Sequence, residues 1–331
     1  MRLHRQAATV IPCLYAVAVF GWAIAHRLVG DGYWLLALAN SVAVYFFAPL
    51  PLVVVLSVLG RTPARLAALA SALLFFGLFG GAFIPTGRIA SSEGETPAVT
   101  VMTYNVLADR TEVALTLQAI QRAQPDLIGF QELRLQVARE LERHLEDEYP
   151  YRTRVPLGCG AGVAIWSRYP LESEQIDFPA PCQLQSALVD LGERRVRVVN
   201  VHAQSHTSWR PRRVERNFAL RREQIETILA YVEGRPEPLI LMGDMNSAPM
   251  HEVIQLLTAR LHDAFSDAGR GFGHTFPATS GRLRGVYYPS RLMRLDYVFH
   301  SDAWTAERAW LAEWDGYSDH LAVLARLRLR E

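Results

Sequence analysis

Three long uncharged segments near the N-terminus restrict the fold of this chain more than any other feature. They cover Ala7–Ala25, Gly32–Gly60 and Leu66–Ile84. About 20 apolar residues cross the roughly 30 Å hydrocarbon core of a bilayer, so each segment is long enough for a membrane-spanning helix. Pro49 and Pro51 are expected to kink or end the second helix. A cleaved signal peptide would be shorter and would not be followed by two more spans. Residues 1–86 are therefore predicted to form a membrane anchor of about three helices.

Arginines flank these segments unevenly. Arg2 and Arg5 precede the first segment, and Arg61 and Arg65 lie between the second and the third. The positive-inside rule places these arginines in the cytoplasm. The sequence therefore predicts a multi-pass protein of the plasma membrane or inner membrane, with everything after the third span outside the cytoplasm.

Residues 87–98 are small and polar and are predicted to be a flexible linker to a single domain at 99–331. Residues 1–96 hold six arginines and three acidic residues, which leaves 28 arginines and 30 acidic residues in the rest of the chain. This balance counts against a polynucleotide-binding domain, which usually has a basic surface. Cys159 and Cys182 are predicted to pair in an oxidising compartment, with two buried thiols as the alternative.

The stretch Leu239–Pro249, LILMGDMNSAP, combines a short apolar strand with two polar side chains. The chain is expected to turn at Gly243 and to present Asp244 and Asn246 at the carboxyl end of the strand. Asn246-Ser247 and Pro249 are typical of a helix cap and a first helical turn. In layered α/β proteins ligands bind at such strand-to-helix corners.

Other predicted strands also end in residues that can bind a metal or transfer a proton. Three of these strands are Val99–Val106 with Asn105, Leu127–Leu133 with Glu132, and Arg195–His202 with His202. Asp296 instead lies inside the apolar strand Leu292–His300, and Asp319 and His320 lead into the last strand, within Tyr317–Leu329. Further strands are predicted at Gly162–Ser167 and Leu184–Leu191, and a helix at residues 134–146. This pattern predicts two packed sheets with helices outside.

The ordered motifs TYNV, GFQEL, VNVH, GDMNSAP, RLDYVF and SDH resemble those of the endonuclease/exonuclease/phosphatase superfamily. That superfamily includes pancreatic-type deoxyribonuclease, apurinic endonucleases and neutral sphingomyelinases. The resemblance covers about residues 99–329. It implies a four-layer α/β sandwich, with two central β-sheets flanked by helices, preceded here by three transmembrane helices.

The resemblance also implies roles for individual residues. Glu132 would be the main metal ligand, supported by Asn105 and Asp319. Asp244 would orient or deprotonate the attacking water, and Asn246 would hold a phosphate oxygen. His202 would donate to the phosphate or the leaving group, and Asp296 would pair with His320; either Asp244 or His320 could be the general base.

The residue types themselves favour Mg²⁺, with Mn²⁺ as a substitute, because hard carboxylate and amide oxygens suit these ions better than zinc. A divalent ion and an oriented water would supply phosphoester hydrolysis. The sequence thus predicts a metal-dependent phosphodiesterase, endonuclease or phosphatase bound to the membrane, with no protein partner predicted.

Two substrate classes remain open. A lipid head-group phosphodiesterase of sphingomyelinase type is favoured by the anchor, by six arginines within 209–222 and by Tyr287-Tyr288. Those arginines could equally form an ordinary solvated helix face. An extracytoplasmic DNA endonuclease is favoured by the active-site resemblance and opposed by the charge balance. A third hypothesis is a catalytically silent membrane-bound binding module.

Overall fold

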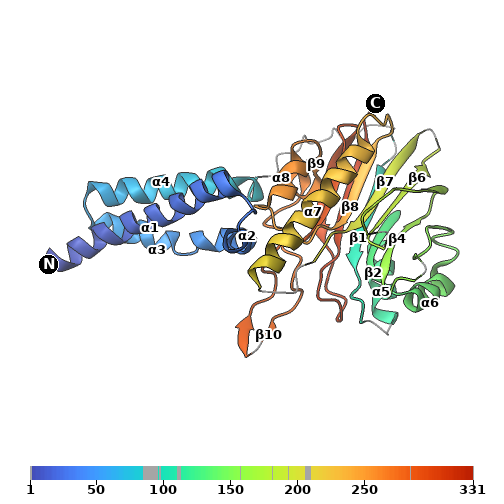
Figure 1. Ribbon diagram of the computed structural model, residues 1–331, viewed down its shortest axis with the longest axis horizontal. Coiled ribbons are helices and arrows are strands. Elements are labelled where there is room, and N and C mark those ends of the chain that lie inside the picture. Colours follow the sequence, from blue (N-terminus) through green and yellow to red (C-terminus); the bar gives the residue numbers. More distant parts are fainter. Residues whose placement is uncertain are drawn as a thin grey trace.

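A helical bundle projects from one side of a two-sheet sandwich in the computed structural model (Figure 1). The structure describes residues 2–84, 96, 98–109, 113–156, 158–180, 182–192, 194–205, 210–283 and 285–330. Most of the predicted linker 87–98 lies outside these residues, so the boundary between anchor and domain stays a prediction.

Two six-stranded sheets and one hairpin account for the strands of the described residues. The first sheet has the order β13 (Trp304–Leu311), β14 (Val323–Leu329), β1 (Ala98–Asn105), β2 (Leu127–Leu133), β4 (Gly162–Ser167) and β3 (Tyr151–Arg152). The second has the order β5 (Leu171–Glu174), β6 (Leu184–Asp190), β7 (Arg195–His202), β8 (Leu239–Asp244), β12 (Asp296–His300) and β9 (His262–Asp263). β10 (Gly281–Leu283) and β11 (Val286–Tyr288) form the hairpin, which projects beyond the sandwich in Figure 1.

Helices cover the outer faces of both sheets. They are α5 (Ala114–Ala123) and α6 (Leu135–Leu145) on the first sheet, and α7 (Pro211–Val232) and α8 (Glu252–Thr258) on the second. Buried side chains of both sheets, such as Val101 and Val198, meet in a central core. A short helix, α9 (Ala264–Ala268), packs at the edge of that core. The alternating strands thus bury one face against the other sheet and one against helices, which confirms the predicted four-layer sandwich.

The bundle consists of α1 (Arg2–Val29), α2 (Trp34–Ser41), η1 (Ala43–Phe47), α3 (Leu50–Leu59), α4 (Thr62–Phe79) and η2 (Gly80–Ala82). Within the described residues, two helices are long and apolar enough to cross a membrane, and a third span exists only if α2 is counted with the following helix across a 73° bend. The expected kink is displaced: the bend lies between Ser41 and Ala43, whereas Pro49 caps α3.

Polar residues explain why α2 leaves the bundle axis. Asp31 accepts hydrogen bonds from Asn40 Nδ2 at 2.9 Å and from the backbone N–H of Glu252 at 2.7 Å. His251 Nε2 lies 3.0 Å from the carbonyl oxygen of Ala37. Buried polar groups require such partners, and here the partners lie at the start of α8. α2 therefore packs on the sandwich, where Ala37 is buried with Val214 and Phe218 of α7. The bent pair that contains α2 remains a candidate for the predicted second span.

A disulfide joins Cys159 and Cys182, whose Cα atoms are 6.0 Å apart. This confirms the predicted pairing. Both cysteines lie in loops that precede strands, β4 and β6 respectively.

Candidate active site

Strand pairing brings the predicted polar residues to one edge of the two sheets. β7 and β8 are parallel, so His202 and Asp244 lie opposite each other at their carboxyl ends. β12 runs antiparallel to β8, which places Asp296 opposite Asp244 from the other side. In the first sheet, Asn105 lies opposite Gln131, next to Glu132.

The backbone of this edge contains three unusual conformations. Gly243 has φ +147°, and a Cβ there would meet the carbonyl oxygen of Val201 at 1.9 Å, so the position requires glycine. The expected turn at Gly243 is nevertheless wrong, because β8 continues to Asp244 and the chain turns at Asn246, which has φ 48°. Glu132 also has a positive φ of 55°, beside a register shift in β2. Strained residues of this kind concentrate at functional sites.

The helix expected to begin at Ser247 and Pro249 begins instead at Glu252, with His251 as its cap. The intervening loop is held by polar contacts rather than by helical ones. Ala248 N–H donates to His251 Nδ1 at 2.9 Å, and Asn246 N–H donates to Asp244 Oδ1 at 2.8 Å. These contacts fix the loop and compete with an early helix start.

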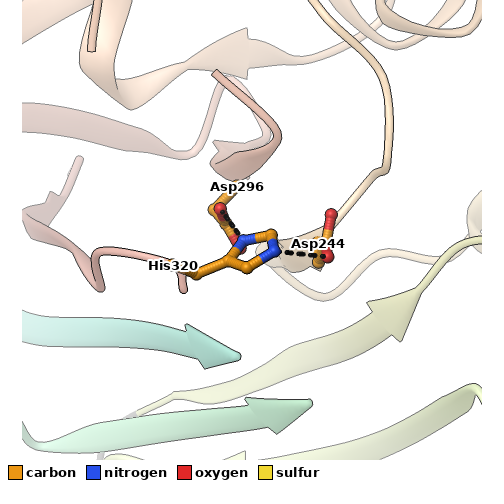
Figure 2. Close-up of side chains that lie close together, drawn as sticks. All are labelled: Asp244, Asp296 and His320. Atoms are coloured by element: carbon orange, nitrogen blue, oxygen red, sulfur yellow. Dashed lines mark hydrogen bonds and ion pairs between the residues drawn. The ribbon is translucent and has the colours of Figure 1, made fainter. Parts of the chain in front are cut away.

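Asp244, Asp296 and His320 form a buried group at the centre of the site (Figure 2). His320 Nδ1 lies 2.8 Å from Asp296 Oδ2, and His320 Nε2 lies 3.8 Å from Asp244 Oδ2. The predicted pairing of Asp296 with His320 is thus present. The three side chains are close enough together to hold an ion, with ligand atoms within 4.8 Å of one another. The same arrangement is also expected without an ion, if a protonated imidazole pairs with the two carboxylates.

Electrostatics favour the charged form of this histidine. Burial alone would lower the pKa of His320, but the charges of Asp296 and Asp244 outweigh it and raise that pKa to about 10. Burial also raises the pKa of the Asp296 carboxyl, against the opposing effect of His320. His320 is therefore an imidazolium near neutral pH and can donate a proton from Nε2.

A second group lies beside the first and includes Glu132, Asn105 and His202. Asn105 Nδ2 donates to Glu132 Oε1 at 3.2 Å and to Asp244 Oδ2 at 3.1 Å. His202 Nε2 lies 3.7 Å from Glu132 Oε1 and 3.8 Å from Asp244 Oδ2. His202 thus lies between two carboxylates of the site and not in the hydrophobic core.

Asp319 contributes a further carboxylate, directly before His320. Burial raises its pKa, and the negative charges of Glu132 and Asp244 raise it further. The half-buried Asp319 therefore shares an electrostatic environment with the other acidic residues. A cation bound among these carboxylates would relieve their mutual repulsion, and their oxygen donors fit a hard divalent ion.

Asn246 has a different environment. Its Nδ2 donates to the carbonyl oxygen of Ala203 at 2.9 Å, which fixes the amide at the rim of the site. Arg221 of α7 holds the same loop, because it donates hydrogen bonds to the carbonyl oxygen of Asn246 and to Ser247 Oγ. Sequence reasoning missed the burial of Arg221, although its spacing from Val214, Phe218 and Ile225 is that of one helix face.

Two sheets flanked by helices, with acidic residues and two histidines gathered at one edge, define a class of phosphoester hydrolases. The model of the Endonuclease/Exonuclease/phosphatase family matches residues 102–320 of the chain. The chain belongs to this family and is a hydrolase.

Solved structures show the same fold at low sequence identity. Sphingomyelinase C from Streptomyces griseocarneus is 23% identical, with 70% of this chain and 99% of that chain covered and a TM-score of 0.53. D. rerio TDP2 in complex with a single-strand DNA product is 18% identical, with 70% and 99% covered and a TM-score of 0.55. An endonuclease/exonuclease/phosphatase from Beutenbergia cavernae is 20% identical, with 70% and 72% covered and a TM-score of 0.53. A comparison with curated proteins found no match.

Proposed function

We propose that this protein is a Mg²⁺-dependent phosphodiesterase, tethered to a membrane and facing away from the cytoplasm. The observation that carries the proposal is the position of His320 between Asp296 and Asp244, with Asn105 linking Asp244 to the carboxylate of Glu132. This arrangement offers both a proton donor and a proton acceptor to a phosphate ester.

Glu132 and Asp319 would hold the ion together with Asn105. The Asn105 amide would have to rotate, because its nitrogen now faces Glu132. A bound divalent ion would neutralise negative charge on the phosphate as it builds up in the transition state. Mg²⁺ suits this set of oxygen donors, and Mn²⁺ is the expected substitute.

The protonation of His320 favours one assignment of the general base. With a pKa raised to about 10, His320 holds its proton at neutral pH and serves as a donor. Asp244 is then the group left to accept a proton from the attacking water, and the Asn246 N–H keeps its Oδ1 oriented. His202 would donate to the phosphate or the leaving group, and Asn246 would hold a phosphate oxygen.

The N-terminal helices support the membrane tether. Two of them have the length and apolar composition of a span. In the bent pair α2 packs on α7, so the third span would be formed by Ala43–Leu59 after the bend. The positions of Arg2, Arg5, Arg61 and Arg65 favour export of the catalytic domain. The disulfide between Cys159 and Cys182 favours it as well. In this proposal residues 1–86 are the anchor, 87–98 the linker and 99–331 the enzyme.

A lipid head group is the substrate class that these features favour. The anchor keeps the site near the membrane, and Tyr287 on the projecting hairpin is 63% exposed. The structural neighbours include a sphingomyelinase and a protein bound to a DNA product, so DNA is the second candidate. The net charge of −2 after residue 96 opposes the DNA candidate.

The test is hydrolysis by the full-length, detergent-solubilised protein. It is incubated with phospholipid vesicles, with plasmid DNA and with bis-p-nitrophenyl phosphate, each with Mg²⁺ or with EDTA. We expect Mg²⁺-dependent release of head groups and intact plasmid. Nicked plasmid with intact lipid would contradict the lipid assignment.

Variants separate catalysis from contamination and from a silent binding module. Asp244→Asn and His320→Gln should each lower turnover by at least about a hundredfold, since each removes a proton-transfer group. Asp147→Asn, an exposed residue after α6, is the matched control and should leave turnover unchanged. Equal hydrolysis by all three variants would show that Asp244 and His320 are not catalytic.

A reporter fused after Glu331 tests the membrane orientation. It should be active only outside the cytoplasm, and activity inside the cytoplasm would overturn the proposed orientation.

A further inference from the structure

A cavity of about 550 Å³ lies apart from the acidic site, between β13 and the loop that follows α9. Three arginines contribute to its lining, namely Arg270, Arg291 and Arg308. Phe272, His274 and Trp310 supply aromatic walls, and no acidic residue lines the cavity within the described part of the chain. The cavity is large enough for a phosphate-bearing head group.

The three arginines are exposed, and among the described residues none of them has a carboxylate partner. Arg308 instead lies over the ring of Trp310, 4.6 Å from its centroid. The backbone of Arg291 is fixed at both ends, because its N–H donates to Pro277 and its carbonyl oxygen lies 2.8 Å from His274 Nδ1. As far as the described residues go, the guanidinium groups are therefore available to an anion, which arginine binds through paired N–H donors.

The wall of this cavity also contacts the end of the anchor. The Phe272 ring lies 6.4 Å from that of Phe79, the last residue of α4, and 5.7 Å from that of Phe83, which follows η2. Gly271 N–H donates to the carbonyl oxygen of Ala82 at 2.8 Å. Phe83 and Ile84 are largely exposed, so apolar surface continues to the level of the cavity. In a bilayer the end of such a helix lies at the head-group layer.

We propose that this cavity binds the head group of an anionic phospholipid from the leaflet in which the anchor ends. The three arginines would contact the phosphate, and the aromatic rings would face the interface between head groups and acyl chains. The proposal rests on the membrane tether of the proposed function but not on its hydrolytic chemistry. It adds a second lipid-binding site, which holds a lipid without cleaving it.

The same loop connects the cavity to the acidic site. Phe272 and His274 face the anchor and the cavity, while Thr275 Oγ1 accepts a hydrogen bond from Leu295 N–H beside Asp296. The ring of Phe276 lies 4.9 Å from that of His320. The two sites are thus adjacent along the chain but are lined by different side chains, so each can be altered separately.

The experiment measures binding of fluorescent phosphatidylglycerol and phosphatidylcholine to the full-length protein in neutral detergent. The test variant combines R270Q, R291Q and R308Q. One arginine near an anionic lipid surface contributes about a fivefold change in affinity, so we expect phosphatidylglycerol binding to weaken roughly a hundredfold. Phosphatidylcholine binding should change little.

A matched control removes three other exposed arginines, R139Q in α6, R194Q between β6 and β7, and R260Q after α8. It makes the same change in net charge and should retain phosphatidylglycerol binding to within about threefold. The single variants R270Q and R308Q guard against misfolding of the triple variant and should shift affinity in the same direction. Equal binding by wild type and the cavity variants, or an equal loss in the control, would overturn the proposal.

Two further arms identify the ligand. Glycerol phosphate and a single-stranded oligonucleotide are tested as competitors. If the three arginines are required for binding either of these but not for binding the lipid, the ligand is a soluble anion or a nucleic acid and the lipid proposal is wrong. Hydrolysis of bis-p-nitrophenyl phosphate by the triple variant should match wild type. Lost lipid binding with intact hydrolysis supports a separate site, whereas inactive wild type would contradict the proposed function alone.

Discussion

Replacing Asp296 with asparagine tests the central pair of the proposed active site. The substitution keeps the shape of the side chain and removes the charge that faces His320 Nδ1 at 2.8 Å, in a position where both residues are buried. A hydrogen bond to a charged group contributes about 1.5–3 kcal/mol. If that contribution is realised in the transition state, kcat/KM falls by roughly 10- to 150-fold at neutral pH, since about 1.4 kcal/mol corresponds to a factor of ten.

The pH dependence of Asp296→Asn should change as well. Asp296 is the strongest of the charges that raise the pKa of His320 to about 10, so its loss lowers that pKa toward the ordinary value near 6.5. The alkaline limb of the activity profile should then move to lower pH. Because the folded pKa exceeds the unfolded one, the stability contributed by His320 is complete below about pH 6.5 and is lost as the pH rises through about 10. This loss should be smaller in Asp296→Asn.

The assay is Mg²⁺-dependent hydrolysis of bis-p-nitrophenyl phosphate from about pH 6 to about pH 10, with thermal unfolding measured on the same samples. Asp147→Asn is the control for loss of one exposed acidic charge. If the Asp296→Asn variant folds and keeps both the wild-type rate and the wild-type alkaline limb, the reasoning is refuted. The charge and the function of His320 would then not depend on this carboxylate.

Three further predictions concern the ion, the disulfide and the anchor. Glu132→Gln should raise the Mg²⁺ concentration needed for half-maximal activity by at least about tenfold, and an unchanged Mg²⁺ titration would remove Glu132 from the ion site. Cys159→Ser opens a bridge between residues 23 positions apart and should lower the free energy of unfolding by about 3 kcal/mol; no loss in denaturant titrations would show that the bridge contributes little. Ala37→Phe overfills the fully buried contact between α2 and α7 and should cost about 1–3 kcal/mol, visible as faster proteolysis near residues 30–42, whereas wild-type resistance would mean that α2 is not docked.

Local patterns predicted much of the sandwich. β2, β4 and β7 begin and end at the predicted residues, because each is a short apolar or alternating segment bounded by polar turns. The polar residues at the ends of these strands could also be recognised in the sequence, because they interrupt otherwise apolar segments. Their roles as ligands or catalytic groups remain predictions until variants are measured.

Features that depend on distant contacts were not predicted. The late start of α8 depends on contacts of His251 with Ala248 and with the anchor. The docking of α2 depends on Asp31, which stands between two apolar segments and finds its partner 221 residues away. β13 was not predicted either, because the charged pair Glu307-Arg308 interrupts it and a bulge between Ala306 and Arg308 breaks its alternation. Hydropathy alone could not distinguish a helix facing lipid from one facing α7.

The docking of α2 has a consequence for any soluble version of this enzyme. Removing residues 1–97 would leave Val214 and Phe218 without their cover and His251 without the carbonyl of Ala37. The exposed apolar face would favour aggregation. The loop after Asp244 would also lose the contact between His251 and Ala37 that helps to hold it. Purification work should therefore retain the helices or replace Val214 and Phe218 with polar residues, and a low yield of the isolated domain would not indicate a faulty enzyme.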